Sequence, residues 1–271
     1  MKKLLLTMAC MLPATGAFAQ DCTPAHEFET ITPGVLTHAV VTYMPYSGID
    51  DTGKAIGVEG DLLHEIAKRE CLTVKSIPVD SAASMNYVIS GRADVTTGGY
   101  YRTAEREKVV SLSAPLYLDQ MGIVSKDGTS SIAALEGQTV GVIQGDLWVA
   151  DLKKVYGANL KPYPALSQMI QDLDAGRLSA LITGYSVAAT AQSQGQLSDL
   201  KIEVAEPDER VGASVNAGQG SFPLSKRNPE LLAAFNANIA AMHEDGTVKA
   251  ALENYGLDAS ASETGEPRLL D

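Results

Sequence analysis

Runs of apolar and β-branched residues alternate along this chain with stretches in which apolar residues recur every three or four positions. In the first third of the chain, the runs typical of strands span residues 35–42, 72–79 and 93–97. Between them, Leu62, Leu63 and Ile66 share one face of a predicted helix that Asp61 caps, and a second helix is predicted over 81–90. This alternation predicts an α/β protein with parallel sheets.

The second third of the chain repeats this arrangement. Residues 140–143 and 178–183 have the pattern of strands, and AGRLSALITGY at 175–185 resembles SGRADVTTGGY at 90–100. We therefore predict two similar α/β lobes. After residue 216 the pattern becomes helical, and the small, polar residues at 259–271 are predicted to form a disordered, flexible tail.

The segment around residues 93–106 predicts an anion site. Its strand ends at Gly98-Gly99, where the missing Cβ lets the backbone approach a ligand closely. Thr103 then has the position of a helix N-cap, and a helix N-terminus exposes N–H groups that favour an anion. Arg106, one turn further on, adds a two-pronged cationic donor. The alternative is that Arg106 pairs with a surface acid and Thr103 only caps its helix.

Aromatic residues gather at the predicted ligand-binding edge of the sheets. In parallel α/β sheets, ligands lie outside the carboxyl ends of the strands. The tyrosines that fall at or just after these ends are Tyr43, Tyr46, Tyr100 and Tyr101. In the second lobe, a glycine loop brings Asp146 and Trp148 to the corresponding edge. The alternative for each is a structural role, which is core packing for the aromatic rings and helix capping for Asp146.

The beginning of the chain predicts a secretion signal over residues 1–19. Its parts are a basic Lys2-Lys3 pair, an apolar run at 4–12 and an A-x-A cleavage site at 17–19. The apolar run is too short to span a bilayer. Cleavage leaves 252 of the 271 residues, beginning at Gln20, and we expect the mature protein in the periplasm.

Composition narrows the possible partners. The formal net charge of −12 at pH 7 becomes −14 once Lys2 and Lys3 are removed. Such acidity argues against nucleic acid or an anionic membrane as a partner. The four histidines lack the spacing of zinc ligands, and no phosphate-binding P-loop motif is present. We therefore expect no metal and no cofactor.

Two cysteines, Cys22 and Cys71, remain in the mature chain. Export places them in an oxidising compartment. Cys22 precedes the first predicted strand and Cys71 ends the first predicted helix, so the two meet at one edge of the sheet. This placement favours a disulfide over the alternative of two free thiols.

Several motifs in a shared order resemble those of the periplasmic solute-binding proteins of polar amino-acid ABC transporters. They are YMPY at 43–46, GVEGDL at 57–62, the segment 99–106, VGVIQG at 140–145, NPELL at 228–232 and EDGT at 244–247. The resemblance covers nearly all of the mature chain. It implies the two-lobed periplasmic-binding-protein fold of type II, in which two doubly wound α/β lobes joined by two crossing strands close on a ligand.

The resemblance also implies a division of the chain and a function. Lobe 1 is expected over 34–121 and 217–258, lobe 2 over 122–216, and the crossings near 120–125 and 216–224. The protein would capture a small carboxylate-bearing, amino-acid-like solute and dock on an ABC transporter permease in the inner membrane. We expect it to be a monomer.

By position in the motifs, Tyr43 would stack on the ligand, and Thr103 with Arg106 would hold its carboxylate. The candidate ligand-binding residues are Tyr43, Tyr46, Glu59, Gly99, Tyr100, Tyr101, Thr103, Arg106, Asp146, Trp148, Gly184 and Tyr185. The chain departs from the family at three places. Tyr101 stands where the family often has Ser, Asp146-Leu147 replaces a common Thr-Thr pair, and Gly184 replaces the Asp that usually binds the ligand's α-ammonium.

These departures lead to a hypothesis about the ligand. Without an acid at Gly184, we expect a carboxylate that carries a displaced or substituted nitrogen, such as an opine-like, betaine-like or modified amino acid. The alternative is an ordinary amino acid whose ammonium shifts to Asp146 or Glu59.

Two other function classes compete with transport. A periplasmic enzyme of the cyclohexadienyl dehydratase type would need Glu59 or Asp146 as a general acid with a raised pKa. No second catalytic partner is visible in the sequence, so we predict a binding protein and not an enzyme. A sensor domain is disfavoured because no membrane segment follows.

Overall fold

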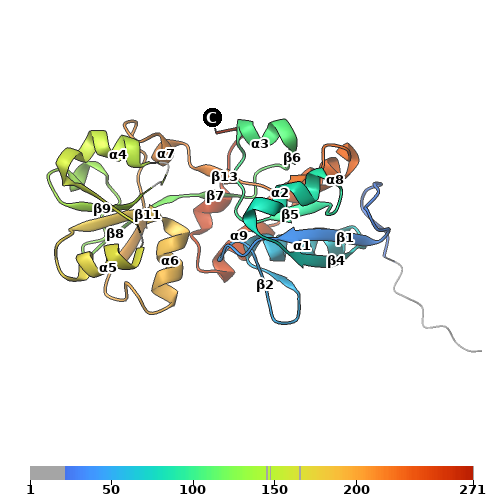
Figure 1. The fold of residues 1–271 in the computed structure, drawn as a ribbon, viewed down its shortest axis with the longest axis horizontal. Coiled ribbons are helices and arrows are strands. Elements are labelled where there is room, and N and C mark those ends of the chain that lie inside the picture. The colour runs from blue at the N-terminus through green and yellow to red at the C-terminus, as the bar shows by residue number, and fades with distance from the viewer. Residues whose placement is uncertain (1–21, 145, 147, 165, 271) are drawn as a thin grey trace, which may run out of the picture.

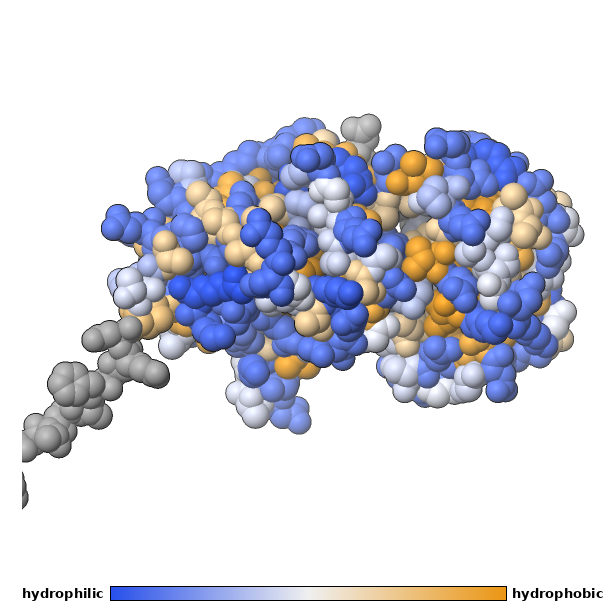
Figure 2. Space-filling view, turned by 180° about the vertical axis from the view of Figure 1, so that it is seen from behind, coloured by the Kyte–Doolittle hydropathy of each residue, from blue (hydrophilic) through white to orange (hydrophobic). Residues whose placement is uncertain are grey.

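The protein consists of two α/β lobes joined by a narrow connection, as the computed structural model shows (Figure 1). The structure describes residues 22–144, 146, 148–164 and 166–270. The predicted secretion signal at 1–19 lies outside these residues. Figure 2 shows the lobes from behind as two masses with a notch between them. Within the described residues, no helix combines the length and the apolar character needed to cross a membrane.

Lobe 1 is built on a sheet whose strand order is β4-β1-β5-β14-β6. Its strands are β1 (Val35–Val40), β4 (Thr73–Pro78), β5 (Val95–Thr97), β6 (Ser111–Leu112) and β14 (Pro223–Leu224). Strand β1 pairs in parallel with β4 and β5, whereas β14 is antiparallel to β5. A small hairpin, β2 (Gly48–Ile49) with β3 (Ala55–Ile56), projects from this lobe (Figure 1).

The helices of lobe 1 come from both ends of the chain. They are α1 (Val58–Arg69), α2 (Ser81–Ile89), α3 (Ala104–Val109), α8 (Pro229–Glu244) and α9 (Thr247–Asn254). The apolar face predicted for α1 is fully buried at Leu62, Leu63 and Ile66, in one core cluster with Phe222 and Phe235. The last two helices therefore complete the core that the first helix begins.

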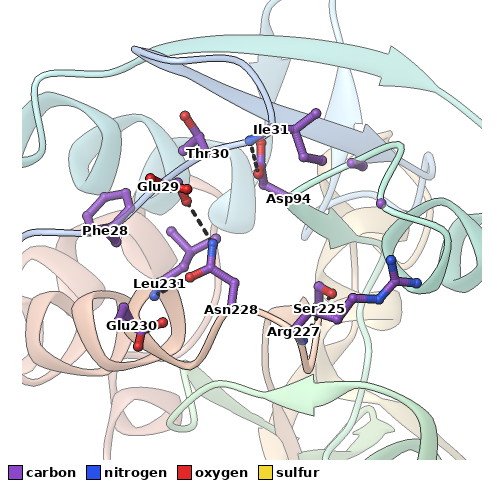
Figure 3. A pocket seen from close by; sticks show the side chains of 12 residues that line it. Phe28, Glu29, Thr30, Ile31, Asp94, Ser225, Arg227, Asn228, Glu230 and Leu231 are labelled. Carbon is purple, nitrogen blue, oxygen red and sulfur yellow. Dashed lines mark hydrogen bonds between the residues drawn. The ribbon is translucent and has the colours of Figure 1, made fainter.

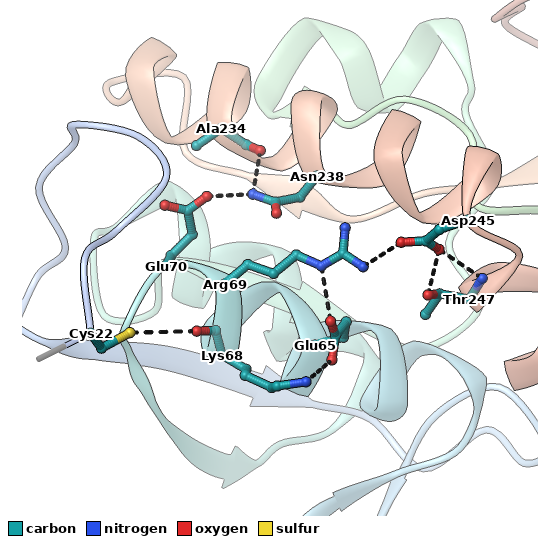
Figure 4. Close-up of polar contacts among 9 residues, drawn as sticks. All are labelled: Cys22, Glu65, Lys68, Arg69, Glu70, Ala234, Asn238, Asp245 and Thr247. Carbon is teal, nitrogen blue, oxygen red and sulfur yellow. Dashed lines mark hydrogen bonds and ion pairs between the residues drawn. The ribbon is translucent and has the colours of Figure 1, made fainter. Parts of the chain in front are cut away.

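Polar contacts also bind the end of α1 to α8 and to the turn that follows α8 (Figure 4). The Arg69 guanidinium pairs with Glu65 on its own helix at 2.9 Å and with Asp245, just after α8, at 2.7 Å. Asn238 of α8 donates to the buried carboxylate of Glu70 at 2.5 Å.

The predicted disulfide between Cys22 and Cys71 is confirmed. The two Cα atoms lie 5.7 Å apart and the sulfur atoms are bonded. The bond links the segment before β1 to Cys71, the second residue after α1.

Lobe 2 has a second sheet, in the order β10-β9-β11-β8-β12. Its elements are β8 (Met121–Ser125), β9 (Val140–Ile143), α4 (Val149–Tyr156), β10 (Leu160–Tyr163), α5 (Leu166–Asp174), β11 (Ala180–Gly184), α6 (Tyr185–Ser193), β12 (Lys201–Val204) and α7 (Gly212–Val215), with short 3-10 turns η1 (Ala133–Leu135) and η2 (Gly157–Asn159). Successive side chains of a strand point to opposite faces. Ile123 and Val124 accordingly belong to two different core clusters, so lobe 2 is packed on both faces of its sheet.

Two short strands form the connection between the lobes. These are β7 (Tyr117–Asp119) and β13 (Gly218–Gly220), which pair antiparallel with Asp119 opposite Gly218 (Figure 1). The first crossing thus lies slightly before the predicted residues 120–125, because Met121–Ser125 is already strand β8 of lobe 2. The second crossing, β13, lies within the predicted range of residues 216–224. A Cβ on Gly220 would come within 2.4 Å of the Tyr117 ring, so this pairing needs glycine there.

The C-terminal segment returns to this connection instead of hanging free, as a flexible tail would. After η3 (Ala259–Ser262), the Gln219 amide of β13 donates to the carbonyls of Thr264 at 2.9 Å and Glu266 at 2.8 Å, and accepts from the N–H of Arg268 at 2.8 Å. Leu270 then exchanges backbone hydrogen bonds with lobe 1 next to Thr103. The segment therefore lies along the connection formed by β7 and β13, which we call the hinge, and reaches the start of α3.

Candidate functional site

The candidate site is a cavity of about 310 Å³ between the lobes. Lobe 1 contributes Tyr101, the hinge contributes Asp119 and Gly218, and lobe 2 contributes Trp148 with the α7 segment. Leu270 of the C-terminal segment closes one side. The cavity lies where the loops after β5 and β9 face the hinge, as expected for a ligand site of an open α/β fold.

A larger cavity of about 460 Å³ lies at the opposite edge of the lobe 1 sheet (Figure 3). Its wall includes Phe28, Glu29 and Asp94, next to the amino ends of β1 and β5. The Asp94 carboxylate accepts the N–H groups of Ile31 at 2.9 Å and Thr37 at 2.8 Å, so it fixes the N-terminal segment against the sheet. We therefore place the functional site between the lobes.

The glycine loop after β5 is held from beneath by Glu59. This α1 side chain is fully buried, and its carboxylate accepts from the N–H groups of Gly98 at 2.8 Å and Gly99 at 3.2 Å. The Tyr117 hydroxyl donates to the same carboxylate at 2.7 Å. Burial raises the pKa of Glu59, and these three donors oppose the rise. Because this side chain is fully buried and does not line the cavity, Glu59 supports the loop and does not contact a ligand directly.

An aromatic row runs from the core to the cleft surface. The Tyr46 ring stacks on Tyr117 at a centroid distance of 4.3 Å, and Tyr43 follows at 6.1 Å. Tyr43 is 42% exposed and lies directly over Gly99, where a Cβ would come within 2.4 Å of its ring. Gly99 also has a φ of +69°, which favours glycine. The structure thus presents an exposed ring at the end of a rigid row, which is suited to stacking on a ligand.

The predicted cap of α3 is present, because the Thr103 hydroxyl accepts the Arg106 N–H at 3.2 Å. The helix terminus is less open to an anion than the sequence indicates. The Ala104 N–H donates to the Leu270 carbonyl at 2.9 Å, and the Arg106 N–H is already taken by the Thr103 hydroxyl. The anion-binding capacity of this corner therefore resides mainly in the Arg106 side chain.

The Arg106 guanidinium is half-buried above a tyrosine. It lies 5.2 Å from the Tyr100 ring centroid and donates to the Tyr101 carbonyl at 2.7 Å. Burial lowers its pKa below the usual value for arginine. No ion pair joins it to a carboxylate among the residues that the structure describes. Tyr100 itself is buried, does not line the cavity and shares a hydrogen bond with Ser84, so it supports Arg106 from below.

Asp119 of β7 lines the cavity and is a candidate site residue that the sequence analysis missed. The residue is 9% exposed, and its carboxylate accepts from Tyr46 at 3.2 Å, from Ser186 at 3.4 Å and from Tyr101. Burial raises the pKa of Asp119, and these three hydroxyl donors oppose the rise. The only sequence signal was that Tyr-Leu-Asp ends the strand leading into the crossing.

Asp146 and Trp148 bring unsatisfied polar atoms to the lobe 2 side. Within the described residues, the Asp146 Oδ2 and Trp148 Nε1 atoms are buried and have no hydrogen-bond partner. Burial first, and then the charge of Asp119, raise the pKa of Asp146 to about 6. A buried polar atom without a partner costs roughly 1–3 kcal/mol. These atoms are therefore available to a ligand that enters the cleft.

Gly184 and Tyr185 join lobe 2 to the hinge. Gly184 is the N-cap residue of α6, and a Cβ built on it would lie 3.6 Å from Asp119 Oδ1. The Tyr185 N–H donates to the Gln120 carbonyl at 2.8 Å. Glycine at 184 thus leaves room beside the Asp119 carboxylate.

The described residues provide no group of three metal-ligating side chains. His38 is buried between Ser76 and Thr97, and burial lowers its pKa to about 3. It is therefore a neutral residue of the sheet interior.

Comparisons with known proteins agree with this arrangement. The family model of the bacterial extracellular solute-binding proteins, family 3, matches residues 36–258. The lysine/arginine/ornithine-binding periplasmic protein of Escherichia coli (strain K12) is 27% identical, over 94% of this chain and 97% of its own. These matches confirm the predicted family, and the dehydratase alternative receives no support from them.

Solved structures confirm the predicted two-lobed fold of type II. Substrate-binding domain 2 of Lactococcus lactis GlnP, in an open conformation, is 27% identical with a TM-score of 0.69, covering 82% of this chain and 95% of that one. An ancestral arginine-binding protein bound to arginine is 30% identical with a TM-score of 0.54, covering 82% and 98%.

Proposed function

The chain belongs to the bacterial extracellular solute-binding proteins, family 3, and from this membership we propose that it is the periplasmic substrate-binding component of an ABC transporter. It captures a small carboxylate-bearing, amino-acid-like solute between its lobes and delivers it to a permease in the inner membrane. The relative named for lysine, arginine and ornithine supports a ligand of this class. The secretion signal predicted at 1–19 supports a periplasmic location.

The observation that carries the proposal is the half-buried guanidinium of Arg106, which has no carboxylate partner among the described residues. An anion from outside the protein restores the charge balance of such a group, and a carboxylate matches its two-pronged geometry. The exposed Tyr43 ring would cover the apolar part of the same ligand.

Binding without chemistry agrees best with the site. The pKa of Asp146, raised to about 6, is in a range that suits a general acid. Burial and the neighbouring Asp119 account for that pKa without any catalytic demand. Incubation with candidate carboxylates should therefore return each compound unchanged, and a product would instead reveal an enzyme.

The direct test is mass spectrometry of the small molecules released when purified protein is denatured. We expect a nitrogen-containing carboxylate from the wild type and none from Arg106→Ala prepared in parallel. A thermal-shift panel of the twenty standard amino acids and substituted derivatives then measures binding. A ligand at a hundredfold excess over its Kd adds about 2.7 kcal/mol, or roughly 5–10 °C in Tm. A panel without any shift, together with no released compound, would contradict the proposal.

A further inference from the structure

We propose that Asp119, on hinge strand β7, binds the cationic nitrogen of the ligand in place of the lobe 2 acid that is missing at Gly184. This inference rests on the proposed function and names the residue that recognises the positive end of the solute. It places that residue on the connection between the lobes and not on lobe 2.

The first support is position. An ideal Cβ on Gly184 would lie 3.6 Å from Asp119 Oδ1, which is ordinary van der Waals contact. A carboxylate at 184 would therefore start beside the carboxylate that Asp119 already provides. An acid at residue 184 would thus serve the same corner of the cavity that Asp119 already lines.

The second support is the absence of any compensating positive charge among the described residues. Asp119 is 9% exposed, and its three side-chain partners are the neutral hydroxyls of Tyr46, Tyr101 and Ser186. The carboxylate of Asp146 is close enough to feel its charge. Two buried or half-buried acids without a cation are costly, and a cationic ligand relieves that cost.

The third support is independent of the acids. Trp148 is 7% exposed, lines the same cavity as Asp119, and its buried Nε1–H has no acceptor among the described residues. A ligand that satisfies this donor must carry a hydrogen-bond acceptor near its cationic nitrogen. The rings of Tyr101 and Trp148 in the cavity wall also attract cations.

The chemistry that fits is a cationic nitrogen, primary or substituted, with a carboxylate or carbonyl oxygen nearby. The hypothesis of a displaced or substituted nitrogen started from the premise that no acid remains at this corner. Asp119 supplies one, so an ordinary α-ammonium also fits the site.

The test compares charge-changing variants by calorimetry. The probes are L-arginine, L-ornithine and L-cystine, each beside its Nα-acetyl derivative, in which the α-nitrogen is uncharged. Asp119→Asn keeps the shape of the side chain and should weaken binding of the best probe by about 30-fold or more, as expected for a buried charge left unpaired. Asp174→Asn, the same change at an exposed position, should leave the affinity unaltered.

Substitutions at residue 184 provide a second test. One restores an acidic charge at this corner, and another places a positive charge there that competes with the ligand for Asp119. Gly184 has a φ of −58°, and a Cβ there makes only ordinary contacts, so a side chain fits. Asp119→Asn combined with Gly184→Asp should recover a large part of the lost affinity. Gly184→Lys should pair with Asp119 and abolish binding, whereas Gly184→Gln, of similar length but neutral, should bind more tightly than Gly184→Lys.

The outcomes separate this inference from the proposed function. If the wild type binds a probe and Asp119→Asn binds it equally well, Asp119 is not the cation site, although the protein is still a solute receptor. The same holds if Asp119→Asn does not fold and Gly184→Lys binds as tightly as Gly184→Gln. If the wild type binds no probe and releases no small molecule, the proposed function itself is wrong.

Discussion

A half-buried guanidinium without a carboxylate partner is unusual in a protein with a formal net charge of −12. Removing Arg106 should therefore damage ligand binding more than folding. Arg106→Ala should cost about 2–5 kcal/mol in binding free energy, because the ligand's carboxylate is left unpaired. Arg106→Lys should also bind poorly, because lysine cannot form the two-pronged contact. Calorimetry with the ligand found by mass spectrometry measures both.

Arg92 gives a matched control for this experiment. Its guanidinium also lies over a tyrosine ring, Tyr87, at 4.0 Å, but it follows α2 at the other edge of the lobe 1 sheet. Arg92→Ala should retain wild-type affinity. Near-native binding by both Arg106 variants would show that the carboxylate is held elsewhere.

Asp146 should make the binding of a cationic ligand depend on pH. Its pKa of about 6 means that it is mostly protonated at pH 5 and mostly charged at pH 7. Burial first, and then the charges of Asp119 and Asp146, raise the pKa values of Tyr43 and Tyr101, so both tyrosines stay neutral over this range. Affinity should fall about tenfold from pH 7 to pH 5, and Asp146→Asn should flatten this step. A wild-type affinity that does not change over this range would exclude Asp146 from cation binding.

In the ligand-free protein, Asp146 should change folding stability with pH in the opposite direction to its effect on ligand affinity. The folded protein binds a proton at Asp146 more tightly than the unfolded chain does, because the folded pKa is above the usual value of 3.8. The contribution of this group to stability is therefore lost as the pH rises from about 4 to about 6. The Tm of Asp146→Asn minus that of the wild type should be larger at pH 7 than at pH 5.

Candidate site residues that form a motif within one short segment could be predicted from the sequence. Those that depend on contacts between distant segments could not. Gly99, Thr103 and Arg106 lie in one segment whose order of glycine, cap and arginine is readable without a fold. Asp119 becomes a candidate site residue because Tyr46, Tyr101 and Ser186 surround it. Apart from its place at the end of Tyr-Leu-Asp, the neighbouring sequence carries no sign of these contacts.

At the scale of elements, strands and helices follow the hydrophobic pattern closely. The predicted strand at 35–42 is observed as Val35–Val40, and that at 140–143 as Val140–Ile143. The C-terminal segment could not be predicted in this way, because its small, polar composition is typical of disorder. A single side chain on β13, Gln219, anchors it, and residues in the hinge and lobe 1 complete the contact.

We therefore expect Gln219 to contribute to stability through this anchor. Gln219 is 1% exposed and makes three hydrogen bonds with the backbone of the C-terminal segment. Gln219→Ala leaves those backbone groups unsatisfied and should lower the free energy of unfolding by about 1–3 kcal/mol. Thermal unfolding measures the loss.

Gln138→Ala is the matched control for Gln219→Ala. The Gln138 amide is exposed and makes one hydrogen bond to the carbonyl of Ala134 at 3.0 Å. Its removal should change stability by no more than about 0.5 kcal/mol. Equal melting temperatures for the two variants would mean that the C-terminal segment is not held by Gln219 in solution.

At the scale of the whole molecule, the two lobes are separate packing units. Each core cluster of described residues lies within one lobe, with Phe222 and Phe235 in lobe 1 and Ile123 and Val124 in lobe 2. The direct ladder between β7 and β13 spans only three residues on each strand. A rigid-body rotation of the lobes about this ladder would therefore disturb neither core.

The comparisons are consistent with an open arrangement of these units. The chain superimposes with a TM-score of 0.69 on a structure described as open and with 0.54 on one bound to arginine, although the second is more similar in sequence. A difference in lobe orientation would produce this order, because a TM-score over the whole chain falls when two domains are rotated against each other.

We therefore predict that ligand binding closes the lobes. The charged ends of the ligand would join Arg106 of lobe 1 to acids on the hinge and lobe 2, so the free energy gained by both contacts favours the closed form. Small-angle scattering should give a smaller radius of gyration at saturating ligand than without it. Arg106→Ala, at the same ligand concentration, should keep the larger value because it binds weakly. If the radius of gyration of the wild type is unchanged while calorimetry proves saturation, the site is rigid, and recognition by the permease must depend on something other than closure.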